Sequence, residues 1–315
     1  MPLVRTLLIS CVAALLGFAC APATTAVRGA TQQSAGGGST SANADHRGIN
    51  RTLTWPPQED WIAPPTPVQP PDADLAFPTP TPAPAPDGRH HPASSPFSTL
   101  ARGYDASWPQ CSAGRKPTGA TYGIIGINGG KAFTLNPCFL DLMKAAPKGA
   151  GIYLNTGFNP KNAARMLPYC AAQAALLPGA TAKQQLAYGL GCSTTVDTLR
   201  VMSDFNIPAP SIWWLDVEET NSWDDAEPSV NRYSILGQLD QLAPTGKTIA
   251  VYSDFPDWKQ ITGGTWGDPR IAGNWVAGKS PQDACSHPGF SGAPVWLAQE
   301  LATWPGSGYD SDYAC

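Results

Sequence analysis

Two acidic residues stand at the end of an apolar run in the second half of the chain. Asp216 and Glu218 follow the run 212–215, Ile-Trp-Trp-Leu, and are separated by one valine. On a β-strand, residues two positions apart point to the same side. Neighbouring carboxyl groups shift each other's pKa, so one can stay protonated as a general acid while the other stays ionised. Glycoside hydrolysis uses such a pair, but strand-end acids that cap a helix or face solvent have the same spacing.

Two further acids lie near the first and last predicted strands. Asp105 lies in the segment 103–107, and Asp310 follows the last strand-like run. The first and last strands of a closed barrel are neighbours, and functional side chains gather at the C-terminal ends of barrel strands. We therefore expect Asp105 and Asp310 to line the same mouth as Asp216 and Glu218.

Tryptophans supply the aromatic surface on which sugar rings commonly lie. The chain has 11 Trp, and each should be either core or a binding platform. Trp213 and Trp214 are adjacent on one strand, so at least one of them should be core. The candidates for a platform are Trp108, Trp213, Trp214, Trp223, Trp258 and Trp296.

The elements that position these residues alternate between strands and helices. Short runs predict strands at 103–107, 122–128, 151–155, 211–217, 248–253, 274–277 and 294–299, with helices at 137–146, 159–175, 195–205 and 229–242. Most strand runs are continuously apolar, which is typical of parallel strands buried on both faces. The pattern predicts an α/β fold over 98–315, a TIM-like β/α barrel with irregular late units. A doubly wound open sheet is the alternative, and no glycine-rich nucleotide loop supports it.

The segment 1–26 has the pattern of a signal peptide. Arg5 precedes the apolar stretch 6–19, and small residues follow as far as Ala26. This stretch is shorter than the about 20 residues of a membrane-spanning helix. A lipoprotein signal ending at Cys20 is the alternative, and a lipid there would be the only membrane contact. We expect a protein outside the cytoplasm, either secreted or attached to the cell envelope.

The segment 27–97 is rich first in Gly, Ser and Thr and then in Pro. Such a composition buries too little apolar surface to offset the entropy of ordering. We expect a disordered linker whose Pro-rich part is extended, either a tether or a plain spacer.

Six cysteines of the domain suggest three disulfides in an exported protein. Six cysteines allow 15 pairings, of which pairing sequence neighbours is the simplest. A zinc site is disfavoured because the domain holds no Cys-x-x-Cys motif and only His287, so we expect neither metal nor cofactor. The expected pairs are Cys111–Cys138, Cys170–Cys192 and Cys285–Cys315.

Seven segments, in order, resemble the glycoside hydrolase family 25 lysozymes. The segment 103–107 with Gln110 resembles that family's opening G-x-D-x-S…Q, and 215–218 resembles its D-x-E strand. The other matches are 122–130 with 134–139, 149–153, 249–253, 295–299 and 308–312.

This resemblance implies a β/α barrel that cleaves the β-1,4 bond between N-acetylmuramic acid and N-acetylglucosamine with net retention. It implies that Glu218 is the general acid and that Asp216 stabilises the transition state or orients the substrate's N-acetyl group. Asp105 and Asp310 would position substrate and tune the pKa values of this pair. Expected substrate contacts are Trp108, Asn128, Trp214, Tyr252, Trp296, Gln299 and Asp312.

The chain departs from the family in three places. The second strand lacks the family's acid and reads Ile-Asn-Gly-Gly-Lys at 127–131. The region 155–210 is longer than the family's third unit, and Glu300 replaces a tyrosine. These changes surround the expected cleft and bear on the substrate more than on the fold.

Two other functions remain open from the sequence: a non-catalytic glycan-binding module, and a wall-tethered interaction protein. The expected partner is a polysaccharide or peptidoglycan, and we expect a monomer. The net charge of −4 and the absence of a Lys/Arg cluster argue against nucleic-acid binding.

Overall fold

A computed structural model describes residues 94–113, 116–278 and 280–315 of the chain. The predicted signal peptide, the lipidation at Cys20 and nearly all of the predicted linker lie outside these residues. Phe97, placed in the linker by the sequence, packs against the rings of Tyr122 and Trp214 at centroid distances of 4.8 and 6.5 Å. The folded domain therefore begins slightly before residue 98.

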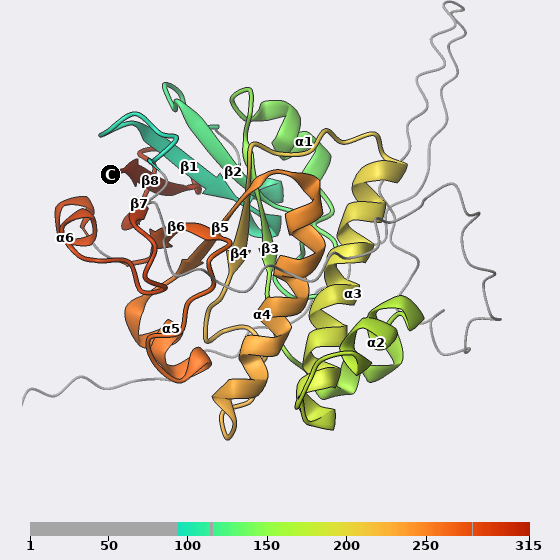
Figure 1. Cartoon of the computed structure of the whole chain (residues 1–315). Helices are drawn as coiled ribbons and strands as arrows, with labels where there is room; N and C mark the ends of the chain where they lie inside the picture. Colours follow the sequence, from blue (N-terminus) through green and yellow to red (C-terminus); the bar gives the residue numbers. More distant parts are fainter. Residues whose placement is uncertain (1–93, 114–115, 279) are drawn as a thin grey trace, which may run out of the picture. The chain divides into compact units, whose positions relative to one another are not determined.

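Eight strands close into one barrel in chain order, which confirms the predicted fold (Figure 1). Strands β1 to β7 are parallel, and β8 pairs antiparallel with both β7 and β1. The strands are β1 (Arg102–Ala106), β2 (Tyr122–Gly126), β3 (Gly151–Asn155), β4 (Ile212–Asp216), β5 (Thr248–Ser253), β6 (Ile271–Val276), β7 (Val295–Thr303) and β8 (Asp310–Ala314).

Strand β8 was not predicted, because its sequence Asp-Ser-Asp-Tyr-Ala is too polar to read as a buried strand. The chain between Thr303 and Asp310 is too short for the helical crossover that a parallel strand needs, so β8 returns as the second arm of a hairpin. The barrel is thus irregular in its last unit, as expected.

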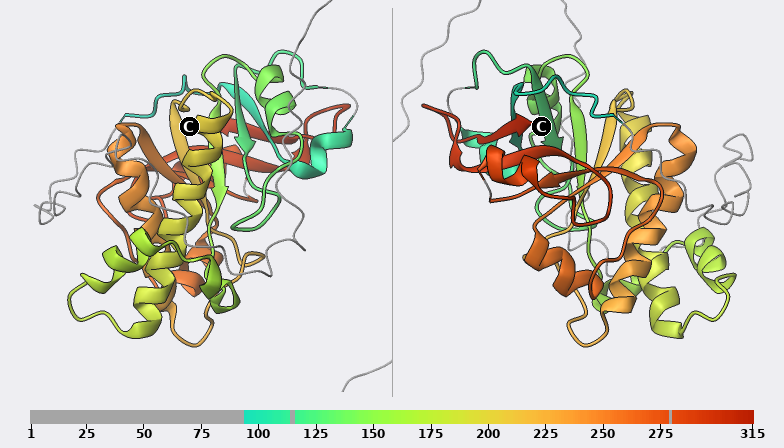
Figure 2. Two further views of the ribbon diagram at one scale, coloured as in Figure 1. Left: turned by 90° about the vertical axis from the view of Figure 1, so that its right-hand side faces the viewer. Right: turned by 60° about the vertical axis from the view of Figure 1, so that its left-hand side comes forward.

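Helices lie outside the barrel, and α3 and α4 run side by side (Figure 2). The helices are α1 (Phe139–Ala145), α2 (Pro168–Ala175), α3 (Ala182–Asp204), α4 (Pro228–Leu242), α5 (Phe255–Thr262) and α6 (Pro281–Ser286). The sequence did not predict α5 or α6. None of the helices in the described part of the chain is long and apolar enough to cross a membrane.

Two helix predictions were wrong in their bounds. The helix expected at 159–175 is split into a 3-10 turn, Pro160–Arg165, and α2, because Leu167 precedes a proline and is therefore kept extended. Helix α3 starts 13 residues before the expected residue 195, with a capping box formed by Thr181 and Gln184. Gly191, which weakened the helical pattern, lets α3 approach the backbone of Ser234 on α4.

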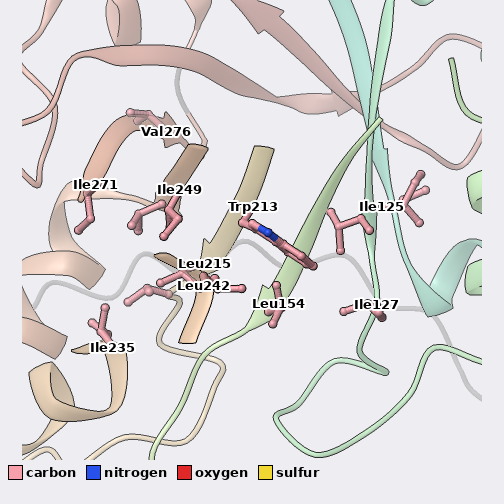
Figure 3. Packing of buried hydrophobic residues seen from close by; sticks show 14 of the residues in the cluster. Ile125, Ile127, Leu154, Trp213, Leu215, Ile235, Leu242, Ile249, Ile271 and Val276 are labelled. Carbon is pink, nitrogen blue, oxygen red and sulfur yellow. The ribbon is translucent and has the colours of Figure 1, made fainter. Parts of the chain in front are cut away.

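Alternate residues of each strand pack on the two faces of the barrel wall. Outward-facing side chains such as Ile125, Leu154, Trp213 and Leu215 form the main core beneath the helices (Figure 3). Inward-facing side chains, among them Tyr122, Ile124, Trp214, Tyr252 and Trp275, fill the barrel itself. Asp216 shares the parity of Trp214, so its carboxyl group faces the inside of the barrel.

The three disulfides join Cys111 to Cys138, Cys170 to Cys192 and Cys285 to Cys315. These are the pairs of sequence neighbours that were expected. The last disulfide ties the residue after β8 to α6, so it holds the strand that carries Asp310 in place.

Candidate active site

The acids singled out by the sequence come together at one end of the barrel. Asp105 near the end of β1 lies in register with Asp310 on the adjacent strand β8. Asp216 ends β4, and Glu218 follows it by two residues. Burial raises the pKa values of both Asp105 and Glu218, the charge of Asp310 raises both further, and Glu218 also raises that of Asp105. The four carboxyl groups therefore form one electrostatic cluster.

The carboxyl groups of Asp216 and Glu218 lie close enough to interact directly. Two carboxyl groups in such contact hold a proton between them, because like charges at this distance cannot both ionise. Burial, and then the negative charge of Glu218, raise the pKa of Asp216 well above its usual range. The pair therefore favours a state in which one carboxyl group is protonated and the other is ionised.

Two asparagines fix the carboxyl group of Asp216. The Asn155 side-chain amide donates to Asp216 Oδ2 at 2.5 Å, and Asn221 Nδ2 donates to the Asp216 carbonyl at 3.1 Å. Asn155 lies directly beside Asp216 in the β3–β4 register, and its own backbone N–H donates to Asn128 Oδ1 at 2.9 Å. Asn128, predicted to contact substrate, is buried and acts through Asn155.

Glu218 is the more accessible member of the pair, since it is half-buried whereas Asp216 is buried. Burial raises the pKa of Glu218, its hydrogen bond to Asp216 lowers it, and the nearby charges of Asp257 and Asp254 raise it again. The indole N–H of Trp223 donates to the Glu218 carbonyl at 2.6 Å and fixes the backbone there. A half-buried carboxyl group with a raised pKa is suited to general acid catalysis.

Asp105 is held by a chain of hydrogen bonds across the barrel mouth. Tyr252 donates its hydroxyl to Gln299 Oε1 at 2.6 Å, and Gln299 Nε2 donates to Asp105 Oδ2 at 2.8 Å. Burial and then the charge of Asp310 raise the pKa of Asp105 well above its usual range, and the Gln299 hydrogen bond opposes the shift. Two of the predicted substrate contacts, Tyr252 and Gln299, therefore position a carboxyl group of the cluster.

Three of the residues expected to contact substrate are buried in the core of the structure. Trp214 is 0% exposed and Trp296 is 2% exposed, both in the cluster that fills the barrel. Asp312 is also fully buried, and neither of its oxygens meets the geometry of a hydrogen bond. Burial, and then the charges of Asp105 and Asp310, raise the pKa of Asp312 well above its usual range.

One of the candidate tryptophans is exposed enough to serve as an aromatic platform. Trp213 and Trp258 are core residues, and Trp223 is partly buried beneath Glu218. Trp108 is 50% exposed in the turn after β1, with its indole N–H against Gly130 in the loop after β2. Of the candidate tryptophans, Trp108 therefore offers a flat, exposed ring at the barrel mouth to a sugar.

The sequence missed three residues that contact the acid cluster or lie in its field. Asn155 and Asn221 hold Asp216, and Tyr153, which hydrogen-bonds Ser107, lies close enough to Asp105, Asp216 and Glu218 for their charges to raise its pKa. Asn155 and Tyr153 share the inward parity of β3, which is a signal available in the sequence. Asn221 lies in a loop and carries no such signal.

A cleft of about 600 Å³ adjoins the acid cluster on the side of α3. Asn221 and Thr156 line it, and these residues hold Asp216 or directly follow Asn155. None of the four clustered acids lines the cleft. It lies one side chain away from the proton-sharing pair.

Comparisons with known proteins give similarities to solved structures alone. No family model and no curated protein matches the chain. A bacterial lysozyme from Streptomyces coelicolor is similar at 17% identity over 69% of this chain and 93% of its own, with a TM-score of 0.43. A family GH25 lysozyme from Aspergillus fumigatus is similar at 15% identity over 69% and 94%, with a TM-score of 0.43. The modular Cpl-1 endolysin, solved with a peptidoglycan analogue, is similar at 17% identity over 69% and 55%, with a TM-score of 0.39.

Proposed function

We propose that this chain is an exported glycoside hydrolase of the muramidase type that cleaves the glycan of peptidoglycan. The observation that carries the proposal is the gathering of Asp105, Asp216, Glu218 and Asp310 at one mouth of the barrel, where their charges interact. The order of the seven sequence segments that resemble family 25 lysozymes supplies the substrate class. Three disulfides favour an oxidising compartment outside the cytoplasm.

In the proposed reaction the proton of the pair passes through Glu218 to the glycosidic oxygen as the bond from that oxygen to C1 breaks, which leaves Asp216 ionised. Asp216 and Glu218 lie on the same side of one strand end, close enough for their charges to interact, whereas a covalent retaining mechanism needs carboxyl groups about 5–5.5 Å apart on opposite sides of the bond. This geometry favours the substrate's own N-acetyl oxygen as the nucleophile, with Asp216 accepting the hydrogen bond of its N–H. Water then opens the cyclic intermediate and returns a proton to Glu218, which gives net retention.

The product identifies the bond that is cut. Purified peptidoglycan is digested with the full chain, and the new reducing ends are reduced with borohydride and analysed as sugar alcohols. N-acetylmuramitol is the expected product. N-acetylglucosaminitol would place the cut at the other linkage.

Absence of any new reducing end, together with co-sedimentation of the chain with the polymer, would instead support the glycan-binding module. That alternative draws on the exposed Trp108 and on the cleft lined by Asn221 and Thr156, both of which would serve binding without catalysis.

A further inference from the structure

We propose that the cleft beside the acid pair is a subsite for a carboxylate-bearing branch of the glycan, recognised by Lys131 and Arg165. This inference rests on the proposed function, because it names the part of the same substrate that the cleft takes.

The cleft and the catalytic cluster carry opposite charges. Among the described residues that line the cleft, Lys131 and Arg165 are cationic and none is acidic. The adjoining cluster holds four carboxyl groups. A ligand that spans both would place an uncharged linkage at the acids and an anionic group beside the two cations. These two parts of the ligand would be about one side chain apart.

The lining offers hydrogen bonds as well as charge. Asn159, Asn162 and Asn221 bring carboxamides to the cleft, while Phe133 and Leu190 provide apolar surface. This combination of apolar walls, a few polar groups and a volume of about 600 Å³ is typical of a small-ligand site. Arginine is suited to carboxylates because its guanidinium donates two parallel hydrogen bonds.

The wall that carries both cations is built in an unfavourable backbone conformation. Phe133 is a buried residue with φ of 62°, a region that bulky residues rarely adopt. Arg165 Nη1 donates to the Phe133 carbonyl at 2.8 Å, and the guanidinium lies 5.5 Å from the centroid of its ring. Such outliers persist where the surroundings enforce them and cluster at ligand sites.

The same loop is joined to the acid pair by hydrogen bonds. Asn128 Nδ2 donates to the Thr134 carbonyl at 2.9 Å, and Asn128 Oδ1 accepts from the backbone N–H of Asn155, which holds Asp216. The cleft wall and the catalytic pair are therefore parts of one hydrogen-bonded unit.

The nearby carboxyl group of Asp197 does not neutralise the positive charge of the cleft. Asp197 on α3 interacts electrostatically with Arg165, but also with Arg200, and burial raises its pKa to about 6. Asp197 does not line the cleft. Lys131 is exposed, lines the cleft and adds a second positive charge there.

The test uses the full chain carrying Glu218→Gln, which prevents turnover. Its binding to matched tetrasaccharides of alternating N-acetylglucosamine and N-acetylmuramic acid is compared. One probe has free lactyl carboxylates, one has these groups as carboxamides, and one carries an L-Ala–D-Glu dipeptide on each. Dissociation constants are measured by calorimetry. We expect at least one anionic probe to bind about tenfold more tightly than the carboxamide, and the better of the two identifies where the branch carries its carboxylate.

Lys131→Gln removes one cation of the cleft, and Lys148→Gln is the matched control at the opposite end of the barrel. Both lysines are exposed, so neither change should alter the melting temperature. Lys131→Gln should lose most of the preference for the anionic probe, and Lys148→Gln should keep it.

Equal affinity for carboxylate and carboxamide probes, equal effects of the two variants, or no binding of any probe would overturn the subsite. Each of these results leaves the release of reducing ends by the native chain as a separate measurement, so the failure of the subsite and that of the proposed function are distinguishable.

Discussion

Asp105 on β1 stands opposite Asp310 on β8, across the antiparallel strand pair that closes the barrel. Each carboxyl group faces the inside of the mouth, and the charge of Asp310 raises the pKa of Asp105. The hairpin that ends the barrel therefore completes the acid cluster begun by β1 and β4. A parallel eighth strand would run in the opposite direction and would bring its N-terminal end, with Asp310, to the far end of the barrel.

Gln299 is expected to be a positioning residue. Replacing Gln299 with Leu leaves both Asp105 and the Tyr252 hydroxyl without this partner, which should cost about 1–3 kcal/mol of unfolding free energy. We expect about a tenfold loss of kcat and a further rise in the pKa of Asp105, visible in the pH–rate profile.

Tyr252→Phe is the control for Gln299, because it removes the hydroxyl and leaves the Gln299–Asp105 hydrogen bond intact. It should lower kcat less than Gln299→Leu does. Equal losses in the two variants would show that the effect is structural.

The fold should be more stable at mildly acidic pH than at alkaline pH. The folded-state pKa values of Asp105, Asp216 and Asp312 are raised, so the folded protein holds protons that the unfolded chain releases. Their stabilising contribution is full below the unfolded pKa near 4 and is lost as the pH rises through the folded pKa. Melting temperatures measured from pH 4.5 to 9 should therefore fall with pH.

Asp312→Asn should flatten that decline, because it removes the most deeply buried of these titrating groups. At pH 9 the melting temperature of Asp312→Asn should have fallen less than that of the native chain, by about 2–4 °C for each kcal/mol of unfolding free energy that the substitution recovers. Asp141→Asn, at an exposed site, is the control and should leave the slope unchanged. A native melting temperature that rises steadily over this range would contradict the raised pKa values.

The basic limb of the pH–rate profile should report the proton on Glu218. Burial raises its pKa above the usual value, so activity should persist above pH 4.5 and fall as Glu218 ionises. Asp257→Asn removes a negative charge that raises this pKa, while its side-chain oxygen can still accept from the Glu219 N–H. In Asp257→Asn the basic limb of the kcat/KM profile should therefore move to lower pH. The control is Asp225→Asn, at an exposed site of the β4–α4 loop, which should leave the limb in place.

Removal of the Cys170–Cys192 or the Cys285–Cys315 disulfide should affect stability and activity differently. Each closes a loop of 22 or 30 residues, so removing either should cost about 3 kcal/mol. Replacing Cys285 and Cys315 with Ser frees the end of β8 and should also lower kcat, because Asp310 is less well fixed. Replacing Cys170 and Cys192 loosens α2 and should leave kcat nearly unchanged at a temperature where both variants are folded. The opposite order of activities would count against a role for β8 in the site.

The sequence predicted the part of this architecture that depends on local pattern. Short runs, most of them continuously apolar, located β1 to β7, and the two-residue spacing of Asp216 and Glu218 placed both on one side of their strand. Proximity of Asp105 and Asp310 followed from closure of the barrel. Strand β8 was missed because its stability comes from its neighbours and from the Cys285–Cys315 disulfide rather than from apolar residues.

Burial of individual tryptophans could not be predicted. Trp213 and Trp214 point to opposite faces of β4, yet both are fully buried, because one face meets helices and the other fills the barrel. The hydrogen bonds of Asn155 and Asn221 depend on long-range placement, which no local pattern encodes.

The central claim is that Glu218 acts as a general acid, and its most direct test is sugar release from purified peptidoglycan by the native chain, Glu218→Gln and Glu219→Gln. Glutamine keeps the shape of glutamate and removes the titrating proton. Glu219 is the exposed neighbour and serves as the control. We predict a loss of a hundredfold or more in kcat for Glu218→Gln and less than a twofold change for Glu219→Gln. Equal release by all three proteins, or none by the native chain, would contradict the account.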